Sequence, residues 1–231
     1  MRRMLRRLVR NTGFSRRIAP NFAEVCSANQ IGIVLDVGAN DGGYGRELRD
    51  SGYTGCIHSF EPNPSAFKRL SASIAKDSLW SAVTYGVGQE TGSLDLNISE
   101  ADVFSSFKEL NDFGAKSDNT KVVDTVEAKV VRLDDYLTEH PELLARPYLK
   151  IDTQGFEREV LEGLGNMLHE MIAIQVETSL VDSYVGETDW LESMQYMRDA
   201  GYEVATMVCN SSIPSKARVR EFDIVYVRKD A

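Results

Sequence analysis

From residue 31 to the end of the chain, short hydrophobic runs alternate with segments in which hydrophobic residues recur at helical spacing. This alternation is typical of βα units that build a parallel sheet. Strands are predicted at residues 31–35, 56–60, 82–85, 148–152, 171–176, 202–208 and 222–227, and we expect the last two to be antiparallel to each other. Helices are predicted at about 44–50, 64–74, 133–137, 156–164 and 190–197. The pattern therefore predicts an α/β fold.

The βα rhythm stops between residues 92 and 130. Residues 92–98 and 126–132 alternate with a period of two, which predicts the two arms of a hairpin. Residues 99–124 between them are polar and irregular. An excursion of this length inside a compact domain is often a binding loop or a lid. We therefore expect one domain over residues 31–231 that carries an insertion at about 92–130.

The first 30 residues differ from the rest of the chain. Residues 1–17 contain seven arginines and no acidic residue, and Met4, Leu5, Leu8 and Val9 would share one face of a helix. This pattern predicts a basic helical extension over residues 1–30. It could lie against the acidic body, contact a membrane surface, cover an anionic substrate or form a dimer contact.

Composition narrows the classes of protein. The formal charge is −9, with 42% hydrophobic and 26% charged residues, which indicates a globular chain and argues against binding to nucleic acid. The three cysteines form no CxxC pair, so neither a disulfide framework nor a thiolate zinc site is expected. No run is long enough for a membrane span or a secretory signal. We expect a cytoplasmic protein.

A glycine-rich turn follows the first predicted strand, in the sequence LDVGANDGGYG at residues 35–45. Asn40 stands where a dinucleotide fingerprint requires its second glycine, and no Gly-Lys-Ser/Thr ending marks a P-loop. Asp36 would repel a pyrophosphate, but it suits a ligand that carries a positive centre and an amino group.

Glu61 closes the second predicted strand, 25 residues after Asp36. An acidic residue at about this distance from such a turn accepts the hydroxyl groups of a ribose. The alternative is that Glu61 is only an acidic residue before a helix. The turn and Glu61 together indicate an adenosine ligand without a pyrophosphate, and S-adenosylmethionine has these features.

Further acidic residues end the later strands at the same sheet edge. Asp152 follows strand 148–152 in the sequence LKIDTQGFE, and Glu177 follows strand 171–176. Either carboxylate could act as the base that activates an acceptor hydroxyl, with Asp152 the first candidate. The same pair could instead hold Mg²⁺. Glu157 could be catalytic or simply a helix first-turn acid, and Lys150 could neutralise the cluster.

These motifs resemble the FkbM-type S-adenosylmethionine-dependent methyltransferases. The resemblance rests on LDVGANDG (35–42), FEPNP (60–64), VGQETGSL (87–94), RLDDYL (132–137), KIDTQGFE (150–157) and QVE (175–177). It implies a Rossmann-like class I methyltransferase fold, with a seven-stranded, mostly parallel sheet, one antiparallel strand and helices on both faces. It also implies O-methylation of a hydroxyl on a sugar, a glycolipid or polysaccharide, or a natural product.

The matching motifs imply two sets of site residues. The cofactor site is expected at Asp36, Gly38, Asn40, Asp41, Gly42, Tyr44, Glu61, Pro62, Asn63, Val87, Gly88 and Asp152. The catalytic site is expected at Asp152, Glu177 and Glu157. The acceptor pocket is expected in the loop 99–124, where Ser105 and Ser106 could line it or simply pack.

Two other classes stay open. A nicotinamide-dependent oxidoreductase or epimerase would use a similar fold, although Asn40 argues against its cofactor. A non-catalytic binding module with a methyltransferase-like sheet is the second alternative. His58, His140 and His169 lack the spacing of metal ligands, and no GxSxG elbow supports a hydrolase. We expect a small-molecule or glycan acceptor as partner, with a homodimer as an open option.

Overall fold

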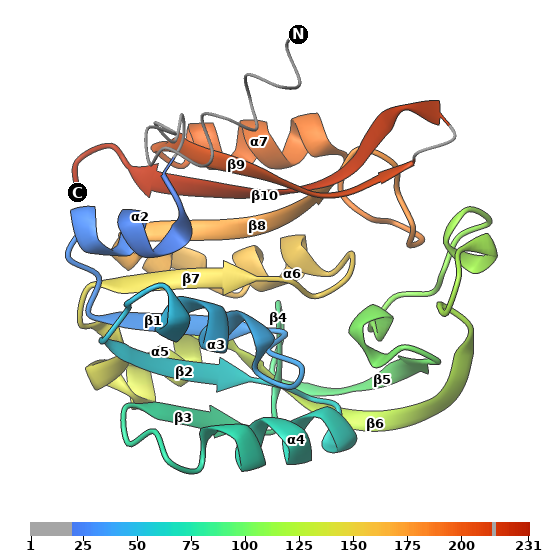
Figure 1. The fold of residues 1–231 in the computed structure, drawn as a ribbon, viewed down its shortest axis with the longest axis horizontal. Coiled ribbons are helices and arrows are strands. Elements are labelled where there is room, and N and C mark those ends of the chain that lie inside the picture. The colour runs from blue at the N-terminus through green and yellow to red at the C-terminus, as the bar shows by residue number, and fades with distance from the viewer. Residues whose placement is uncertain (1–19, 214–215) are drawn as a thin grey trace, which may run out of the picture.

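The computed structural model describes residues 20–213 and 216–231 (Figure 1). Its main sheet has seven strands in the order β3-β2-β1-β7-β8-β10-β9. All neighbours pair in parallel except β10, which is antiparallel to both β8 and β9. The strands are β1 (Ile33–Val37), β2 (Cys56–Phe60), β3 (Trp80–Val83), β7 (Pro147–Ile151), β8 (Ala173–Ser179), β9 (Tyr202–Ile213) and β10 (Arg218–Arg228). The expected seven-stranded sheet with one reversed strand is confirmed.

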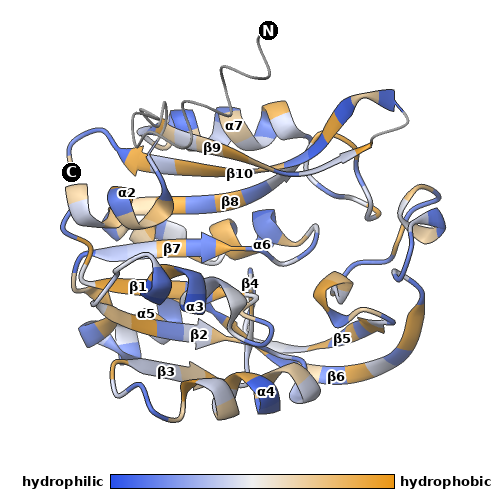
Figure 2. Ribbon diagram, in the orientation of Figure 1, coloured by the Kyte–Doolittle hydropathy of each residue, from blue (hydrophilic) through white to orange (hydrophobic). Residues whose placement is uncertain are grey.

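Helices cover both faces of this sheet, as expected, and each face has its own core. The helices are α2 (Phe22–Ala28), α3 (Gly43–Asp50), α4 (Pro64–Ile74), α5 (Leu133–Glu139), α6 (Glu157–Glu162) and α7 (Trp190–Asp199). Helices α2, α3 and α4 pack on one face, and α5, α6 and α7 pack on the other. Figure 2 shows hydrophobic stretches in the strands of the main sheet and mixed hydrophobic and polar residues along the helices. Burial of both sheet faces explains why the strands appear in the sequence as continuous apolar runs.

A second, smaller sheet stands beside the carboxyl ends of the main strands. Its order is β4-β6-β5, formed by β4 (Gly86–Gly88), β5 (Gly92–Ser99) and β6 (Val122–Arg132). Strands β5 and β6 pair antiparallel over the segments predicted as hairpin arms. Residues 100–121, which we call the capping loop, connect β5 to β6 and contain 3-10 turns at Asp102–Phe104 and Gly114–Lys116.

Several strands differ from their predicted limits. Strand β1 continues to Val37, so Asp36 lies inside the strand and does not close it. Strand β8 continues to Ser179 because β10 pairs with it past Glu177. Strand β3 begins two residues earlier than predicted, at Trp80, whose indole packs in the core and donates to Ser59. Sheet pairing, which hydropathy alone does not report, sets these limits.

The amino-terminal part of the described chain is packed into the domain. A capping box between Asn21 and Glu24 starts α2, and its Val25 and Cys26 are buried in the core on the α3 side. Helix α2 therefore packs against the domain that was expected over residues 31–231. The predicted basic helix of residues 1–17 lies outside the described residues. Among the described residues, no helix has the length and apolar character needed to cross a membrane.

Candidate functional site

A pocket with an empty volume of about 640 Å³ lies at the carboxyl ends of β1, β2 and β7. Ligand sites in open α/β sheets occupy this position. The main sheet and its turns contribute Val37, Gly38, Asn40, Phe60, Glu61, Pro62, Asp152, Thr153 and Gln154. The small sheet and the capping loop contribute Tyr85, Gly86, Val87, Leu96, Asp102, Val103, Ser105, Ser106 and Phe107.

The glycine turn brings the backbone itself to the pocket. Gly38 has φ +77, and a Cβ there would lie 1.9 Å from the backbone oxygen of Asp152. Only glycine fits at this point because the chains after β1 and β7 touch. Asn40 also lies in the left-handed region, with φ 49, and it lines the pocket. The turn is therefore shaped for close approach of a ligand to the main chain.

Glu61 is a buried acidic group at the wall of the pocket. Its side chain is 6% exposed. One carboxylate oxygen accepts the backbone N–H of Asn40 at 2.7 Å, and the other accepts the N–H of Asn63 at 2.7 Å. Burial raises the pKa of Glu61 to about 7, although both N–H donors act in the opposite direction. Each oxygen keeps a further lone pair for a donor in the pocket.

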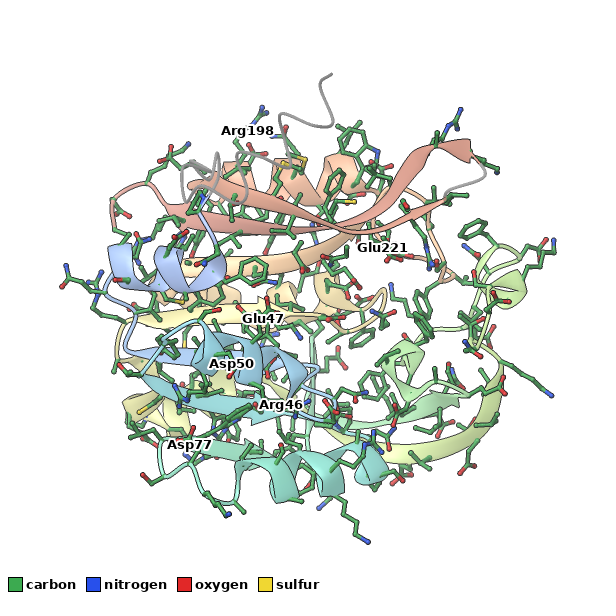
Figure 3. The ribbon with its side chains drawn as sticks, viewed as in Figure 1. Arg46, Glu47, Asp50, Asp77, Arg198 and Glu221 are labelled. Carbon is green, nitrogen blue, oxygen red and sulfur yellow. The ribbon has the colours of Figure 1, made fainter. Side chains whose placement is uncertain are left out.

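Some residues expected at the cofactor site have other contacts. Asp41 pairs with Arg46 at 2.8 Å on the outer side of α3, where Arg46, Glu47 and Asp50 are labelled in Figure 3. Asn63 caps α4, its side chain accepting the N–H groups of Ser65 and Ala66. Neither residue lines the pocket.

Three further residues expected at the cofactor site, Gly42, Tyr44 and Gly88, also have contacts outside the pocket. Gly42 caps α3 and faces Leu70 and Trp80. The hydroxyl of Tyr44 donates to Gln175 at 2.8 Å, on the sheet face under α2. Gly88 allows close packing between the small sheet and α6. Among the described residues, these three contribute to packing around the pocket and not to its wall.

A buried ion-pair chain connects the glycine turn to Asp152. Asp36 and Lys150 are cross-strand partners in β1 and β7, and both are nearly inaccessible to solvent. The Lys150 ammonium lies 3.3 Å from an Asp36 oxygen and 3.4 Å from an Asp152 oxygen, and it donates to the carbonyl of Gly38 at 3.2 Å. Asp36 also accepts a hydrogen bond from the Ser59 hydroxyl at 3.2 Å. Its carboxylate therefore lies beneath the glycine turn. Lys150 thus holds the glycine turn and Asp152 in a fixed position relative to each other.

Gln154 stands between the two proposed bases. Its Nε2 donates to Asp152 Oδ1 at 2.9 Å and to Glu177 Oε2 at 2.7 Å. Asp152 lines the main pocket, whereas Glu177 lines a smaller one behind Gln154. The structure therefore brings the two carboxylates to one amide but exposes them to different cavities.

The surroundings of Glu177 are acidic. Burial raises the pKa of Glu177 well above its usual range, and Asp152, Glu221, Glu157 and Asp223 raise it further. Glu221, labelled in Figure 3, and Asp223 come from β10, and Asp223 is the direct cross-strand partner of Glu177. A carboxyl group in this environment holds its proton more strongly than an ordinary glutamate.

Glu157 supports the turn before α6. Its Oε1 accepts the backbone N–H groups of Thr153 and Gly155 and the hydroxyl of Thr153, at 2.9 to 3.2 Å. Burial raises the pKa of Glu157 to about 7. Its carboxylate lines the smaller pocket with Glu177 and not the main one. This geometry matches the helix first-turn role that the sequence left open beside the catalytic one.

The arrangement does not support the Mg²⁺ option. Lys150 and the Gln154 amide direct N–H groups at Asp152, and the same amide directs one at Glu177. Within residues 20–213 and 216–231, no group of three or more His, Cys, Asp or Glu side chains is placed to hold a metal ion. The oxygens of Asp152 and Glu177 are therefore placed to accept hydrogen bonds and not to coordinate a divalent cation.

Three residues of this site were not expected from the sequence. Gln154 and Phe107 line the pocket, and Tyr184 donates a hydrogen bond to Gln154. Gln154 lies within KIDTQGFE (150–157), so its position was a usable signal. Tyr184 and Phe107 gave none, because only folding brings their loops to the sheet edge.

Comparison with known proteins agrees with this geometry. The family model described as the methyltransferase FkbM domain matches residues 36–204. "Methyltransferase 1" of Beauveria bassiana (strain ARSEF 2860) is 26% identical over 188 residues, covering 75% of this chain and 73% of that protein.

A solved structure of the same family shares the fold. Methyltransferase FkbM from Methylobacillus flagellatus KT superposes with a TM-score of 0.52 at 15% identity, covering 84% of this chain and 43% of that one. The present chain thus spans less than half of the Methylobacillus protein. TrmK of M. capricolum, solved with S-adenosyl-homocysteine, gives a TM-score of 0.49 at 11% identity, covering 91% of this chain and 69% of that one. Because the family model matches most of the chain, from the glycine turn to β9, this protein belongs to the FkbM methyltransferase family.

Proposed function

We propose that this protein transfers a methyl group from S-adenosylmethionine to a hydroxyl of a small or glycan acceptor. The observation that carries the proposal is Glu61: both of its oxygens are fixed by backbone N–H groups at the rim of the pocket, one of them from the glycine turn. A carboxylate fixed in this way can accept two neighbouring hydroxyl groups of a ribose.

The remaining cofactor residues fit the same ligand. Gly38 has no side chain, so a ligand can approach its backbone closely. The Asp36–Lys150–Asp152 chain supplies negative charge beneath this turn. Phe60, Val87 and Phe107 give the pocket an apolar wall suited to a flat base. S-adenosylmethionine, when bound, would supply an electrophilic methyl group on a sulfonium.

Asp152 is the better-placed of the two proposed bases. Its carboxylate lines the main pocket, while Glu177 is separated from that pocket by the Gln154 amide. An acceptor oxygen within hydrogen-bond distance of Asp152 could pass its proton to the carboxylate as the methyl group transfers. Correct placement of that oxygen behind the methyl carbon supplies the rest of the rate enhancement. Glu157 supports the turn on which Asp152 and Gln154 stand.

The acceptor is proposed to enter beside the capping loop. Ser105 and Ser106 from this loop line the pocket, together with Asp102 and Val103. Hydroxyl and carboxylate groups above an apolar wall suit a sugar, as part of a glycolipid or polysaccharide, or a hydroxylated natural product. The net charge of −9 favours such acceptors over nucleic acid.

The test has two stages. Thermal shift should show stabilisation by S-adenosylhomocysteine and none by NAD, because only a ligand of the folded state raises its stability. Labelled S-adenosylmethionine should then transfer label to members of a panel of sugars, glycolipids and hydroxylated natural products, read by mass spectrometry. Stabilisation by NAD would favour the oxidoreductase alternative, and no response to either ligand would favour a non-catalytic module.

A further inference from the structure

Gln154 is hydrogen-bonded through both ends of its side-chain amide and through its backbone oxygen. Its Nε2 donates to Asp152 and Glu177, its Oε1 accepts from the Tyr184 hydroxyl at 3.1 Å, and its backbone oxygen accepts from the Ser106 hydroxyl at 2.7 Å. Its φ of 57 lies in the left-handed region, which is unfavourable for a residue with a side chain. Contacts from outside the turn therefore hold this residue in place.

The amide orientation of Gln154 matters because its two ends are opposite in polarity. With Nε2 toward Asp152 and Glu177, two N–H groups meet two carboxyl groups. After a flip, the amide oxygen would face both carboxyl groups, and these groups would lose both N–H donors. Donation of the Tyr184 proton to Gln154 Oε1 stabilises the observed orientation.

The Tyr184 hydroxyl has a second acceptor, the backbone oxygen of Phe104 in the capping loop, at 3.0 Å. A hydroxyl has one proton, so this proton is shared between the capping loop and the Gln154 amide. Burial raises the pKa of Tyr184, which keeps the hydroxyl a donor at ordinary pH. The ring packs on Gly155, where any Cβ would lie 2.9 Å from it.

The loop that carries Tyr184 is joined to the capping loop along its length. Asn111 donates its backbone N–H to Ser183 at 3.0 Å, and Val185 donates to Glu109 at 2.8 Å. Lys108 donates to the carbonyl of Gly186 at 2.6 Å. Movement of the capping loop must therefore move Tyr184 as well.

We propose that Tyr184 is a positioning residue, which couples the Gln154 amide between Asp152 and Glu177 to the capping loop. The inference rests on the proposed function for the catalytic role of Asp152. It adds that the hydrogen bonds of the proposed base depend on the position of the capping loop.

The first test is Tyr184→Phe, which removes one oxygen atom. Amide hydrogen exchange of residues 100–110 should become about tenfold faster, since one buried hydrogen bond to the loop is lost. The matched control is Tyr226→Phe, because the buried Tyr226 hydroxyl has no hydrogen-bond partner among the described residues. Equal exchange in the two variants would overturn the proposal.

The second test reads the amide orientation directly. Carbon-13 NMR titration of the Glu177 carboxyl, assigned with Glu177→Gln, should show a midpoint about one pH unit higher in Tyr184→Phe than in the wild type, because a favourable N–H donor is lost. In a Gln154→Leu background the same Tyr184→Phe change should produce no further shift. An unchanged midpoint, or an equal shift in both backgrounds, would overturn the inference.

Both measurements are made without cofactor. Failure of the wild-type protein to bind S-adenosylhomocysteine would therefore count against the proposed function alone. Failure of the exchange and titration results would count against the role of Tyr184 alone.

Discussion

Single carboxylates in this protein differ in role because their hydrogen-bond partners differ. Glu61 accepts backbone N–H groups and faces the main pocket, whereas Glu157 accepts backbone N–H groups and holds a turn. Asp152 meets a lysine and an amide at the same pocket. The sequence alone does not distinguish these acids, although their surroundings do.

The Glu61→Gln variant tests the ribose assignment. The amide keeps the volume but replaces one accepting oxygen with a donor, so S-adenosylhomocysteine should bind about ten- to a hundredfold more weakly by calorimetry. Glu47→Gln, on the exposed side of α3, serves as the control. A folded Glu61→Gln protein with wild-type affinity would contradict the assignment.

The Asp152→Asn variant tests the base. We expect turnover of the acceptor found in the labelled-donor screen to fall by about a hundredfold or more, with nearly unchanged affinity for S-adenosylhomocysteine. The exposed Asp50→Asn change provides the comparison. Wild-type turnover in Asp152→Asn would remove this residue from the mechanism.

At the scale of elements, glycines decide how closely the helices approach the sheet. In α3, Gly45 faces the Trp80 indole, and a Cβ there would lie 2.2 Å from two ring carbons. Gly43 in the same helix has only ordinary contacts, the nearest at 3.6 Å. Both glycines are in the same helix, but only Gly45 is tightly packed against a neighbour.

This difference gives a paired prediction. Gly45→Ala should lower the free energy of unfolding by about 1–3 kcal/mol through overpacking. Gly43→Ala should leave it unchanged or raise it by up to about 1 kcal/mol, because alanine loses less entropy in a helix. Urea denaturation of both variants measures the effect, and equal destabilisation would show that the indole contact is not responsible.

For the whole molecule, burial of acidic groups makes stability depend on pH. Glu61 and Glu157 each have a folded pKa of about 7, against an ordinary value of 4.5, and the pKa of Glu177 is also raised. Between pH 4.5 and 7 the folded state therefore binds more protons than the unfolded state. Stability must then fall as pH rises through this window.

The free energy of unfolding should accordingly be higher near pH 5 than near pH 7.5, by a few kcal/mol. Urea denaturation across this range measures the slope. Glu157→Gln should flatten it, because one of the raised groups no longer titrates. A slope of opposite sign would contradict the conclusion that burial disfavours the charged form of these groups.

The sequence by itself determined the architecture and the family. Buried parallel strands require uninterrupted apolar runs, and a turn that touches another chain requires glycine, so both leave local signals. The runs predicted the main sheet, and the motifs around Asp36, Glu61 and Asp152 placed the site at its carboxyl edge. Strand β4 and the limits of β3 and β8 were not predicted, because pairing partners far along the chain set them.

The tertiary structure alone decided which of the expected residues face the pocket. Tyr44 turns to Gln175, Asn63 caps a helix, and Glu177 lies behind Gln154. The direction of a side chain depends on strand register and on neighbours distant in sequence. The pairing of Tyr184 with the capping loop is of this kind, since two loops about 80 residues apart meet only after the sheet has formed.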